Sequence, residues 1–366
     1  MTITAPDDAA ARRDALAGRL FEAALGAFDL FTIHLGDQLG LYRALAEQGP
    51  MRPPELATAA GIAPRYAREW LEQQAVTGLL DVDDANAAPD ARRYALPAGY
   101  AEVLVDPTST SLMAPIAQWV VAGGASMADL VEAYRTGGGV AWDRYQDVVV
   151  AQDRSNRPQF LHSLTQDWLP ALGDIDARLR AQGGRIADVA CGTGWSTIAL
   201  ARGYEKATVD GLDLDADSIA TANDRLATDA PELADRVTFQ ARDAGDPQLA
   251  GRYDLALILE ALHDMAHPVE VLAAVRGLLA PGGALLVADE KVAEAFTAPG
   301  DEVERLMYGY SALFCLPNTL AEEGSIGTGT VLRPDRLREL ALQAGYSSVT
   351  VMPVEHDTFR FYRLDP

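Results

Sequence analysis

A glycine-rich segment in the middle of the chain most constrains how it can fold. Asp188-Val-Ala-Cys-Gly-Thr-Gly194 follows an apolar run at Arg185–Val189 and precedes a helical pattern at Trp195–Arg202. The next apolar run ends at an acid, Asp213. In an open α/β sheet, glycines between a strand and a helix let a ligand approach the backbone, and an acid at the tip of the next strand accepts hydrogen bonds from ribose hydroxyls. The pattern therefore predicts a nucleoside site at the edge of such a sheet.

Alternating strand and helix patterns continue to the end of the chain. The five predicted parallel strands are Arg185–Val189, Thr208–Leu212, Val237–Ala241, Tyr253–Leu259 and Ala284–Ala288. Two further strands, Ser347–Val354 and Thr358–Leu364, are separated only by Glu355-His-Asp357, which is too short for a parallel crossover. We therefore predict an α/β fold in which the last strand enters a mainly parallel sheet antiparallel to its neighbours.

The glycine segment favours a nucleoside without phosphates. The dinucleotide pattern G-x-G-x-x-G/A needs a third small residue, and Thr197 stands in its place. Asp188, which precedes the glycines, suits a positively charged ligand. In these features the chain resembles the class I S-adenosylmethionine-dependent methyltransferases, whose cofactor carries an ammonium and a sulfonium group. The resemblance implies a Rossmann-like seven-stranded sheet over residues 181–366.

The same resemblance assigns further cofactor contacts. An acid after the third strand, here Asp243, accepts from the adenine amino group in that family, although such a residue is otherwise a surface carboxylate. Asp213 has the alternative role of capping the next helix, but Asp215 and Ser218 are better placed for that. The implied cofactor-binding residues are Asp188, Ala190, Gly192, Gly194, Asp213, Leu214, Asp243, Ala244 and Glu260.

Residues 1–100 read as a winged-helix domain. After helical patterns over residues 14–46, two short helices at Pro54–Ala60 and Arg65–Thr77 precede a predicted hairpin. The excess of apolar positions in 14–46 predicts a helical hairpin covered on more than one side, which favours a homodimer. A DNA-binding role is the alternative. It needs a basic surface, whereas the second short helix balances two Arg against two Glu and the net charge is −23.

The charge also argues against nucleic acid and anionic membranes as partners. No apolar run reaches the length of a membrane span, and two cysteines, Cys191 and Cys315, suit a reducing cytoplasm.

Two other segments have alternative roles. Residues 101–180 are predicted to be a helical connector that forms a wall of the substrate pocket, with Gly137-Gly-Gly139 as a hinge between domains or part of a lid. Residues 291–330 are a long excursion that carries several aromatic side chains, typical of a lid or an acceptor-binding wall. The alternative for Arg305–Phe314 is a core helix.

The segment Glu260–Pro268 has three interpretations. His263 and His267 have the i, i+4 spacing of a zinc motif, but Pro268 indicates that a helix begins only after them, so we predict no metal site. His263 is alternatively a structural histidine. The third interpretation is a general base, because histidine titrates near neutral pH.

Leu262-His263-Asp264 resembles the corresponding segment of two-domain small-molecule O-methyltransferases, in which the histidine deprotonates the acceptor hydroxyl. Those enzymes carry an N-terminal winged-helix dimerisation domain and a helical connector, so the resemblance covers nearly the whole chain. Met265 departs from the family's tryptophan. Glu290, at the tip of the fifth strand, either orients His263 or is simply solvated. Pro281-Gly-Gly283 is a family hallmark with a turn-making role.

These features together predict transfer of a methyl group to a hydroxyl of a small aromatic or secondary-metabolite acceptor, with His263 and Glu290 as the catalytic residues. Methylation of carbon or nitrogen with the same cofactor is the first alternative, since an already nucleophilic acceptor needs alignment more than a base. A non-enzymatic winged-helix regulator is the second.

Overall fold

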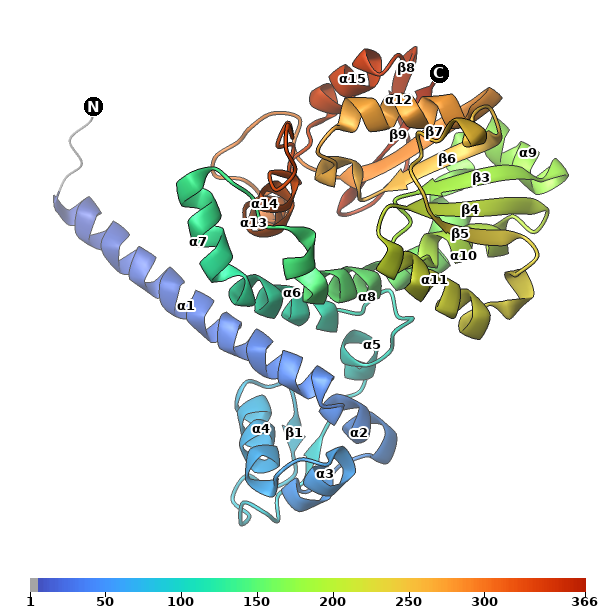
Figure 1. Cartoon of the computed structure of the whole chain (residues 1–366). Helices are drawn as coiled ribbons and strands as arrows, with labels where there is room; N and C mark the ends of the chain where they lie inside the picture. The colour runs from blue at the N-terminus through green and yellow to red at the C-terminus, as the bar shows by residue number, and fades with distance from the viewer. Residues whose placement is uncertain (1–5) are drawn as a thin grey trace. The chain divides into compact units, whose positions relative to one another are not determined.

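The computed structural model describes residues 6–366, with side chains from residue 9, so the first five residues of the predicted 1–100 domain lie outside it (Figure 1). Two compact units are present. One contains the described residues up to Ala125 together with Val150–Ser155, and the other contains Ser126–Val149 and Asn156–Pro366.

The second unit is built on a seven-stranded sheet with the order β5-β4-β3-β6-β7-β9-β8. Its strands are β3 (Gly184–Val189), β4 (Ala207–Asp213), β5 (Val237–Ala241), β6 (Tyr253–Leu259), β7 (Leu279–Glu290), β8 (Ser348–Val351) and β9 (Phe359–Asp365). The pairs from β5 to β7 are parallel, whereas β9 is antiparallel to both β7 and β8. The predicted sheet and its antiparallel last strand are confirmed.

Helices cover both faces of this sheet, which explains why its central strands are almost continuously apolar. The helices are α9 (Asp174–Gln182), α10 (Trp195–Gly203), α11 (Ala216–Asp229), α12 (Pro268–Leu278) and α15 (Pro334–Gln343). Alternate residues of β6 enter different cores: Leu255 and Leu257 pack with α9, α10 and α11, whereas Ile258 packs with α12 and α15.

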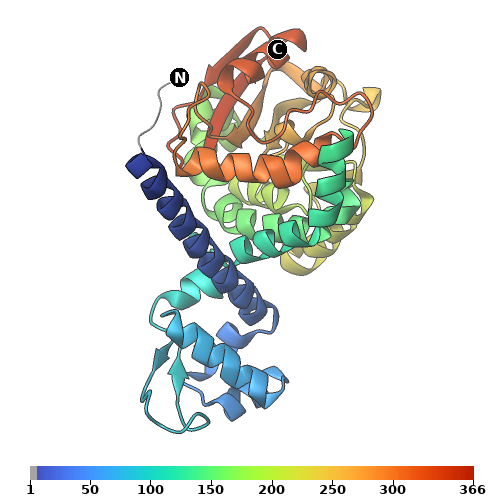
Figure 2. The same ribbon diagram turned by 90° about the vertical axis from the view of Figure 1, so that its left-hand side faces the viewer.

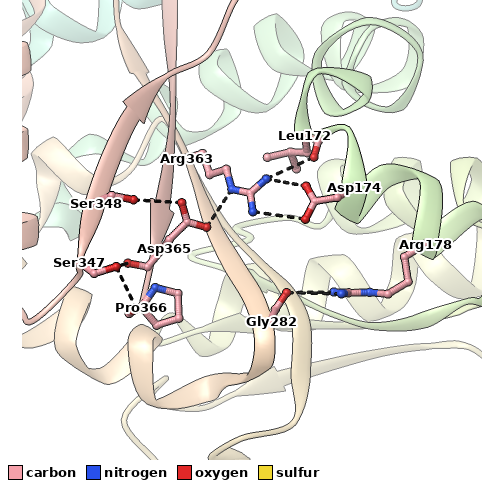
Figure 3. Close-up of polar contacts among 9 residues, drawn as sticks. All are labelled: Leu172, Asp174, Arg178, Gly282, Ser347, Ser348, Arg363, Asp365 and Pro366. Atoms are coloured by element: carbon pink, nitrogen blue, oxygen red, sulfur yellow. Dashed lines mark hydrogen bonds and ion pairs between the residues drawn. The ribbon is translucent and has the colours of Figure 1, made fainter.

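Polar contacts fasten the antiparallel edge of the sheet to α9 (Figure 3). The Arg363 guanidinium on β9 pairs with Asp174 at 2.7 Å and with Asp365 at 2.9 Å. Arg178 donates to the carbonyl of Gly282. Gly282 belongs to Pro281-Gly-Gly283, which lies inside β7 after α12 has ended at Leu278. Gly282 has a φ of 79°, and the β6–β7 register shifts between the pairs Tyr253–Leu279 and Leu255–Ala284, so the three residues bend the chain there.

The first unit has the predicted winged-helix order. It contains α1 (Pro6–Gln38), α2 (Leu41–Gln48), α3 (Pro53–Ala60), α4 (Pro64–Val76), β1 (Asp81–Val82), β2 (Tyr94–Ala95), α5 (Tyr100–Leu104) and α6 (Ala114–Ala125). Its core gathers Tyr42, Leu56, Trp70 and Tyr94. The wing is short, because β1 and β2 pair over only two residues each.

The segment 14–46 is not the hairpin that its pattern suggested. Most of it belongs to one 33-residue helix, α1, drawn in blue in Figure 2. Gly40, in the left-handed conformation, separates α1 from the short α2. The large apolar side chains of α1 that are at least two-fifths exposed are Leu16, Leu20, Phe21, Leu25, Phe28, Phe31 and Leu35. Within the described residues α1 packs on α6, which covers only part of its apolar surface.

The helical segment 101–180 contributes to both units. Beyond α6 it contains α7 (Met127–Thr136), η1 (Trp142–Tyr145), α8 (Gln146–His162), the π-helical η2 (Leu164–Trp168) and η3 (Leu169–Leu172). No helix in residues 6–366 is both long enough and apolar enough to span a bilayer.

The interpretation of Gly137-Gly-Gly139 as a hinge between domains is wrong. Both flanks of the triplet belong to the second unit. Gly137 ends α7 in the left-handed conformation. At Gly139 an added Cβ would lie 2.0 Å from the Ala321 amide nitrogen and 2.4 Å from the Pro317 carbonyl oxygen. Glycine is required there because the two backbones touch.

We expect Gly139→Ala to destabilise the second unit by about 1–3 kcal/mol or more, because the new methyl group would overlap backbone atoms that cannot move aside. Gly138→Ala is the matched control, since its Cβ would meet only the Thr136 hydroxyl at 3.4 Å. Thermal unfolding of both variants checks this, and equal midpoints for the two would contradict it.

Candidate active site

The carboxyl ends of the parallel strands bring the predicted site residues to one edge of the sheet. In an open α/β sheet this edge is where ligands bind. Asp188 is the second-last residue of β3, and Asp213 is the last residue of β4. Asp243 lies just after the end of β5, and Glu260 directly follows β6. Glu290 ends β7. Five segments far apart in the sequence therefore converge because their strands are parallel and adjacent.

The glycine loop is held by the acid of the neighbouring strand. Gly192 and Gly194 have φ values of 52° and 91°, which favour glycine. The Gly192 N–H donates to Asp213 Oδ2 at 2.8 Å, and the Asp215 N–H donates to Asp213 Oδ1 at 2.9 Å. Asp215 caps α11, as predicted, by accepting from the N–H groups of Asp217 and Ser218. Burial raises the pKa of Asp213, an effect that these backbone hydrogen bonds oppose.

Asp188 lies beneath the loop. It is 1% exposed, and its Oδ2 accepts from the hydroxyls of Ser196 and Thr197, each at 2.6 Å. Burial raises the pKa of Asp188 to about 6, although the two hydroxyls favour the charged form. In these contacts Asp188 fastens the first turn of α10 to β3. Its direct contact with a cofactor ammonium stays a prediction.

Two residues of the site hold a backbone conformation that side chains disfavour. Ala190 has φ 57° and Glu260 has φ 54°, and no other non-glycine residue in 6–366 has a positive φ. Each follows directly on a central strand, β3 or β6. Such strain costs on the order of 1–3 kcal/mol and clusters at functional sites. Both residues were predicted to bind cofactor, but nothing in the sequence indicated the strain.

The remaining predicted cofactor residues differ in exposure. A Cβ added at Gly192 would meet nothing within 4 Å, so the loop is open on that side. The Leu214 side chain is 77% exposed beside Asp213. Asp243 is exposed and accepts from the Gly245 N–H, while Ala244 next to it is buried.

The electrostatics favour a positively charged ligand over a phosphate. Glu260 Oε1 and Glu290 Oε2 are buried atoms without a hydrogen-bond partner. A positive charge nearby favours the ionised form of these acids and a phosphate disfavours it, so an ammonium or sulfonium group fits beside them better than a phosphate does. The residues present therefore fit S-adenosylmethionine, with Asp213 and Asp243 toward the nucleoside and the buried acids toward the positive charge.

His263 is oriented by Asp289. It lies in the short helix η6 (Leu262–Asp264), 3% exposed, and its Nδ1 is 2.9 Å from Asp289 Oδ1. Its Nε2 lies 3.5 Å from Asp264 Oδ1. Burial alone would lower the pKa of His263, but Asp289 and Asp264 together outweigh burial and raise the pKa well above its ordinary value.

Glu290 was predicted either to orient His263 or to be solvated, and both predictions are wrong. Glu290 is 7% exposed, so it is not solvated, and the hydrogen-bond partner of His263 is its neighbour Asp289. Side chains alternate along a strand, so only one of two adjacent acids can face His263 in this way. The Glu290 N–H donates to Asp289 Oδ1 at 2.9 Å, which helps to hold the orienting carboxylate.

Glu260 and Glu290 are strongly perturbed. Burial is the largest cause in both, and it raises the pKa of Glu260 to about 8 and the pKa of Glu290 well above its ordinary value. His263 lowers both values, while Asp289 and Asp264 raise them. Glu260 is therefore mostly protonated at neutral pH.

The excursion 291–330 reaches this cluster. It contains α13 (Glu302–Tyr310), the π-helical η7 (Ser311–Cys315) and α14 (Leu316–Thr319). Burial, followed by the charges of Glu290 and Glu260, raises the pKa of Tyr310 to about 12. Cys315 makes a hydrogen bond with His263, and burial raises its pKa to about 12. The segment thus supplies groups to the site, and its helices do not serve as core alone.

The two histidines of the rejected zinc motif have different surroundings. His267 is 38% exposed and lies 3.4 Å from Glu322, whereas His263 is buried against Asp289. Ligand-type atoms of His263, Asp264 and Cys315 lie within 4.8 Å of one another.

Sequence reasoning missed Asp289 and two other residues of the site. Asn156, on α8, makes a side-chain hydrogen bond with Glu260. Trp195, next to the glycine loop, has the guanidinium groups of Arg157 and Arg225 each 4.3 Å from its ring centroid. Of the three, only Asp289 could have been found from the sequence, because it is adjacent to the predicted site residue Glu290. The contacts of Asn156 and Trp195 depend on the tertiary packing of α8 and α11.

We expect Asp289→Asn to lower the pKa of His263, because it removes the carboxylate that most favours the charged imidazolium. Titration of the histidine ring protons by NMR measures this, with His263→Gln used to assign the signal. Asp243→Asn is the control, since Asp243 does not act on His263. An unchanged titration in Asp289→Asn would show that the hydrogen bond does not govern His263.

Two family models match the chain. A methyltransferase domain matches residues 187–285, and an Rv2258c-like winged HTH domain matches residues 27–106. The chain is 30% identical over 186 residues to the O-methyltransferase cnsE of Penicillium expansum, covering 50% of this chain and 60% of that protein. It is 33% identical over 116 residues to a ubiquinone biosynthesis O-methyltransferase of Marinobacter nauticus, covering 32% and 48% respectively. The matched region thus spans about half the length of these relatives.

Solved structures resemble nearly the whole chain. The mitomycin 7-O-methyltransferase MmcR superposes with a TM-score of 0.69 at 19% identity, covering 97% of this chain and 99% of that one. Human N-acetylserotonin methyltransferase in complex with SAM gives 0.66 at 19% identity, covering 95% and 97%. At this identity the likeness establishes the fold. Together with the two domain matches, it shows that the chain carries a methyltransferase domain behind an Rv2258c-like winged HTH domain.

Proposed function

We propose that the protein is an S-adenosylmethionine-dependent methyltransferase that methylates a hydroxyl group of a small, aromatic or secondary-metabolite acceptor. The observation that carries this proposal is the His263–Asp289 pair at the carboxyl edge of the sheet, next to a glycine loop whose residues fit the cofactor. The likeness to cnsE, the ubiquinone biosynthesis enzyme and MmcR, which are O-methyltransferases by name, supports the same reaction class.

The cofactor site uses the loop and the three strand tips beside it. Asp213, already fixed by the Gly192 and Asp215 N–H groups, accepts from ribose with its remaining lone pairs. Asp243 accepts from the adenine amino group, and Leu214 covers the base. When bound, S-adenosylmethionine supplies a methyl group on a sulfonium, which is an excellent leaving group. The protein must then align the acceptor and remove its proton.

His263 removes that proton through Nε2. Asp289 accepts from the Nδ1–H, which fixes the tautomer and the ring plane and stabilises the imidazolium that forms. Because Asp289 and Asp264 raise the pKa of His263, its basic form increases as pH rises. Turnover should therefore increase with pH until His263 is neutral. A positively charged ligand beside the ring lowers that pKa and favours the same form.

The acceptor lies against the excursion 291–330. Tyr310 and Cys315 are the residues of this segment that act on the buried acids and His263. An aromatic acceptor suits a wall that also contains Phe314, which packs edge-on against Tyr145 at 5.7 Å between ring centroids.

We expect His263→Ala to reduce turnover by about 10²–10⁴-fold while leaving cofactor affinity nearly unchanged, because it removes a positioned base but no group that holds the nucleoside. His267→Ala is the matched control, since His267 is partly exposed and pairs with Glu322. Steady-state rates with a methylated acceptor, together with calorimetric cofactor affinity, measure both effects. A loss below about tenfold would remove His263 from the role of base.

Methylation of nitrogen or carbon is the second candidate. It is favoured by the raised pKa of His263, since a protonated histidine anchors an acceptor but cannot take its proton. A loss below about tenfold in His263→Ala would support this candidate over O-methylation.

The domain arrangement and the cellular setting belong to the same proposal. We assign residues 1–100 to dimerisation, 101–180 to the connector and pocket wall, and 181–366 to cofactor binding, in a cytoplasmic enzyme. The two cysteines, both buried and unpaired with each other, suit reducing conditions. DNA is not expected as a partner, because Arg65 and Arg68 on α4 pair with Glu69 and Asp90.

We expect a homodimer formed through α1. Its exposed row of leucine and phenylalanine side chains would otherwise face water. Phe21→Glu combined with Phe28→Glu should give a monomer in sedimentation, because burying two charges on an apolar interface is costly. Val76→Glu, at an equally apolar exposed position outside α1, serves as the control. A monomeric native protein would contradict the assignment.

A further inference from the structure

An unusual number of acids meets at the tips of β6 and β7. Four carboxyl groups, those of Glu260, Asp264, Asp289 and Glu290, act on one another there together with a single imidazole, His263. Among the described residues, no Arg or Lys is a cause of the perturbed pKa values of Glu260, Asp264 or Glu290. The cluster therefore has more buried acid than positive charge to balance it.

No step of the proposed methyl transfer uses Glu260 or Glu290. They are 8% and 7% exposed, and each has a buried carboxyl oxygen without a partner, Oε1 in Glu260 and Oε2 in Glu290. The Glu260 N–H donates to the Ala288 carbonyl at 2.8 Å, which places Glu260 beside the tip of β7. The left-handed backbone of Glu260 holds the side chain there at a cost in strain.

We propose that Glu260 and Glu290 form a carboxyl pair that holds a proton in the cofactor-free protein and exchanges it for the sulfonium charge of the methyl donor. This inference rests on the proposed function. On binding, the O–H bond of the pair breaks and the proton leaves to solvent, while the negative charge left on the pair is balanced by the sulfonium. No covalent bond to the donor forms.

The physical reason is the cost of buried charge. An isolated carboxylate out of water is unfavourable unless a proton or a cation neutralises it. Without a cation nearby, the proton does so, in agreement with a pKa of about 8 for Glu260. A sulfonium beside the pair favours the ionised form and lowers that pKa, so near neutral pH a proton is lost. Well above pH 8 Glu260 is already ionised, so it has no proton to lose.

The charged groups packed around the pair shift the pKa values of Glu260 and Glu290 in different directions. From η6, His263 lowers the pKa of Glu260 and Glu290 when charged, and Asp264 raises it; from β7, Asp289 raises it. Tyr310 from α13 remains protonated near neutral pH, and Asn156 from α8 is neutral. His263 is thus the one other group whose proton a sulfonium could displace.

The pair would also take up a proton after the methyl group has been transferred. Once the methyl group has left, the donor sulfur is neutral, and the carboxylate pair has lost its counter-charge. It then regains a proton, which balances the one that the acceptor hydroxyl has given up. The inference thus predicts a difference between S-adenosylmethionine and S-adenosylhomocysteine, which share the ammonium and the nucleoside but not the sulfonium.

Calorimetric titration of the full chain in two buffers of different ionisation enthalpy tests this. Near neutral pH, S-adenosylmethionine should release about one proton and S-adenosylhomocysteine almost none. As pH rises past the Glu260 value of about 8, the release should vanish and the affinity for S-adenosylmethionine should increase relative to S-adenosylhomocysteine.

Variants identify the residue that releases the proton when S-adenosylmethionine binds. Glu260→Gln should bind S-adenosylmethionine without the release, whereas Glu294→Gln, an exposed glutamate nearby in sequence, should keep it. His263→Gln should also keep it, because removing the imidazolium raises the pKa of the pair. Loss of the release in His263→Gln with its retention in Glu260→Gln would overturn the proposal. If Glu260→Gln does not fold, the comparison of the two ligands on the native chain still decides.

The calorimetric result distinguishes failure of the proposed function from failure of the carboxyl-pair proposal. If neither ligand binds, the proposed function itself is overturned. If both bind with equal proton release, or with none, the cofactor site stands and the carboxyl pair is overturned.

Discussion

The parallel pairing of β3 to β7, in a sheet covered by helices on both faces, is the constraint on which the rest of the structure depends. Because both faces are buried, the central strands must be apolar along most of their length, and polar side chains are left to the strand ends. Because neighbouring strands run the same way, those ends meet at one edge. The glycine loop, the acids at the tips of five strands and His263 therefore lie at one edge although they are far apart in the sequence.

Within that edge, each acid has a different physical situation. Asp188 is buried and hydrogen-bonded to two hydroxyls, so it serves to fasten α10. Asp213 is held by backbone N–H groups in a position suited to ribose. Asp289 pairs with His263. Glu260 and Glu290 each have a buried oxygen without a hydrogen-bond partner, as does Asp289 at its second oxygen, and a proton or a ligand would satisfy such atoms.

The first unit has a complete core but also a large exposed apolar surface. Its winged-helix core is complete around Tyr42 and Trp70, yet α1 leaves a row of large apolar side chains in water. The acidic surroundings of α4 remove the basic footprint that DNA binding needs. The proposed homodimer would cover this surface with a second copy of the chain.

The sequence by itself determined the sheet, the order of its strands in the chain, the glycine loop and the position of His263 just after the fourth parallel strand. These follow from local patterns: apolar runs, glycines and acids at strand ends, and the proline that begins α12. Tertiary structure alone decided which of two adjacent acids, Asp289 or Glu290, faces His263, since that depends on the pleat of β7 against η6. It also decided that Gly139 is a point of backbone contact rather than a hinge, because Pro317 and Ala321 lie far along the chain.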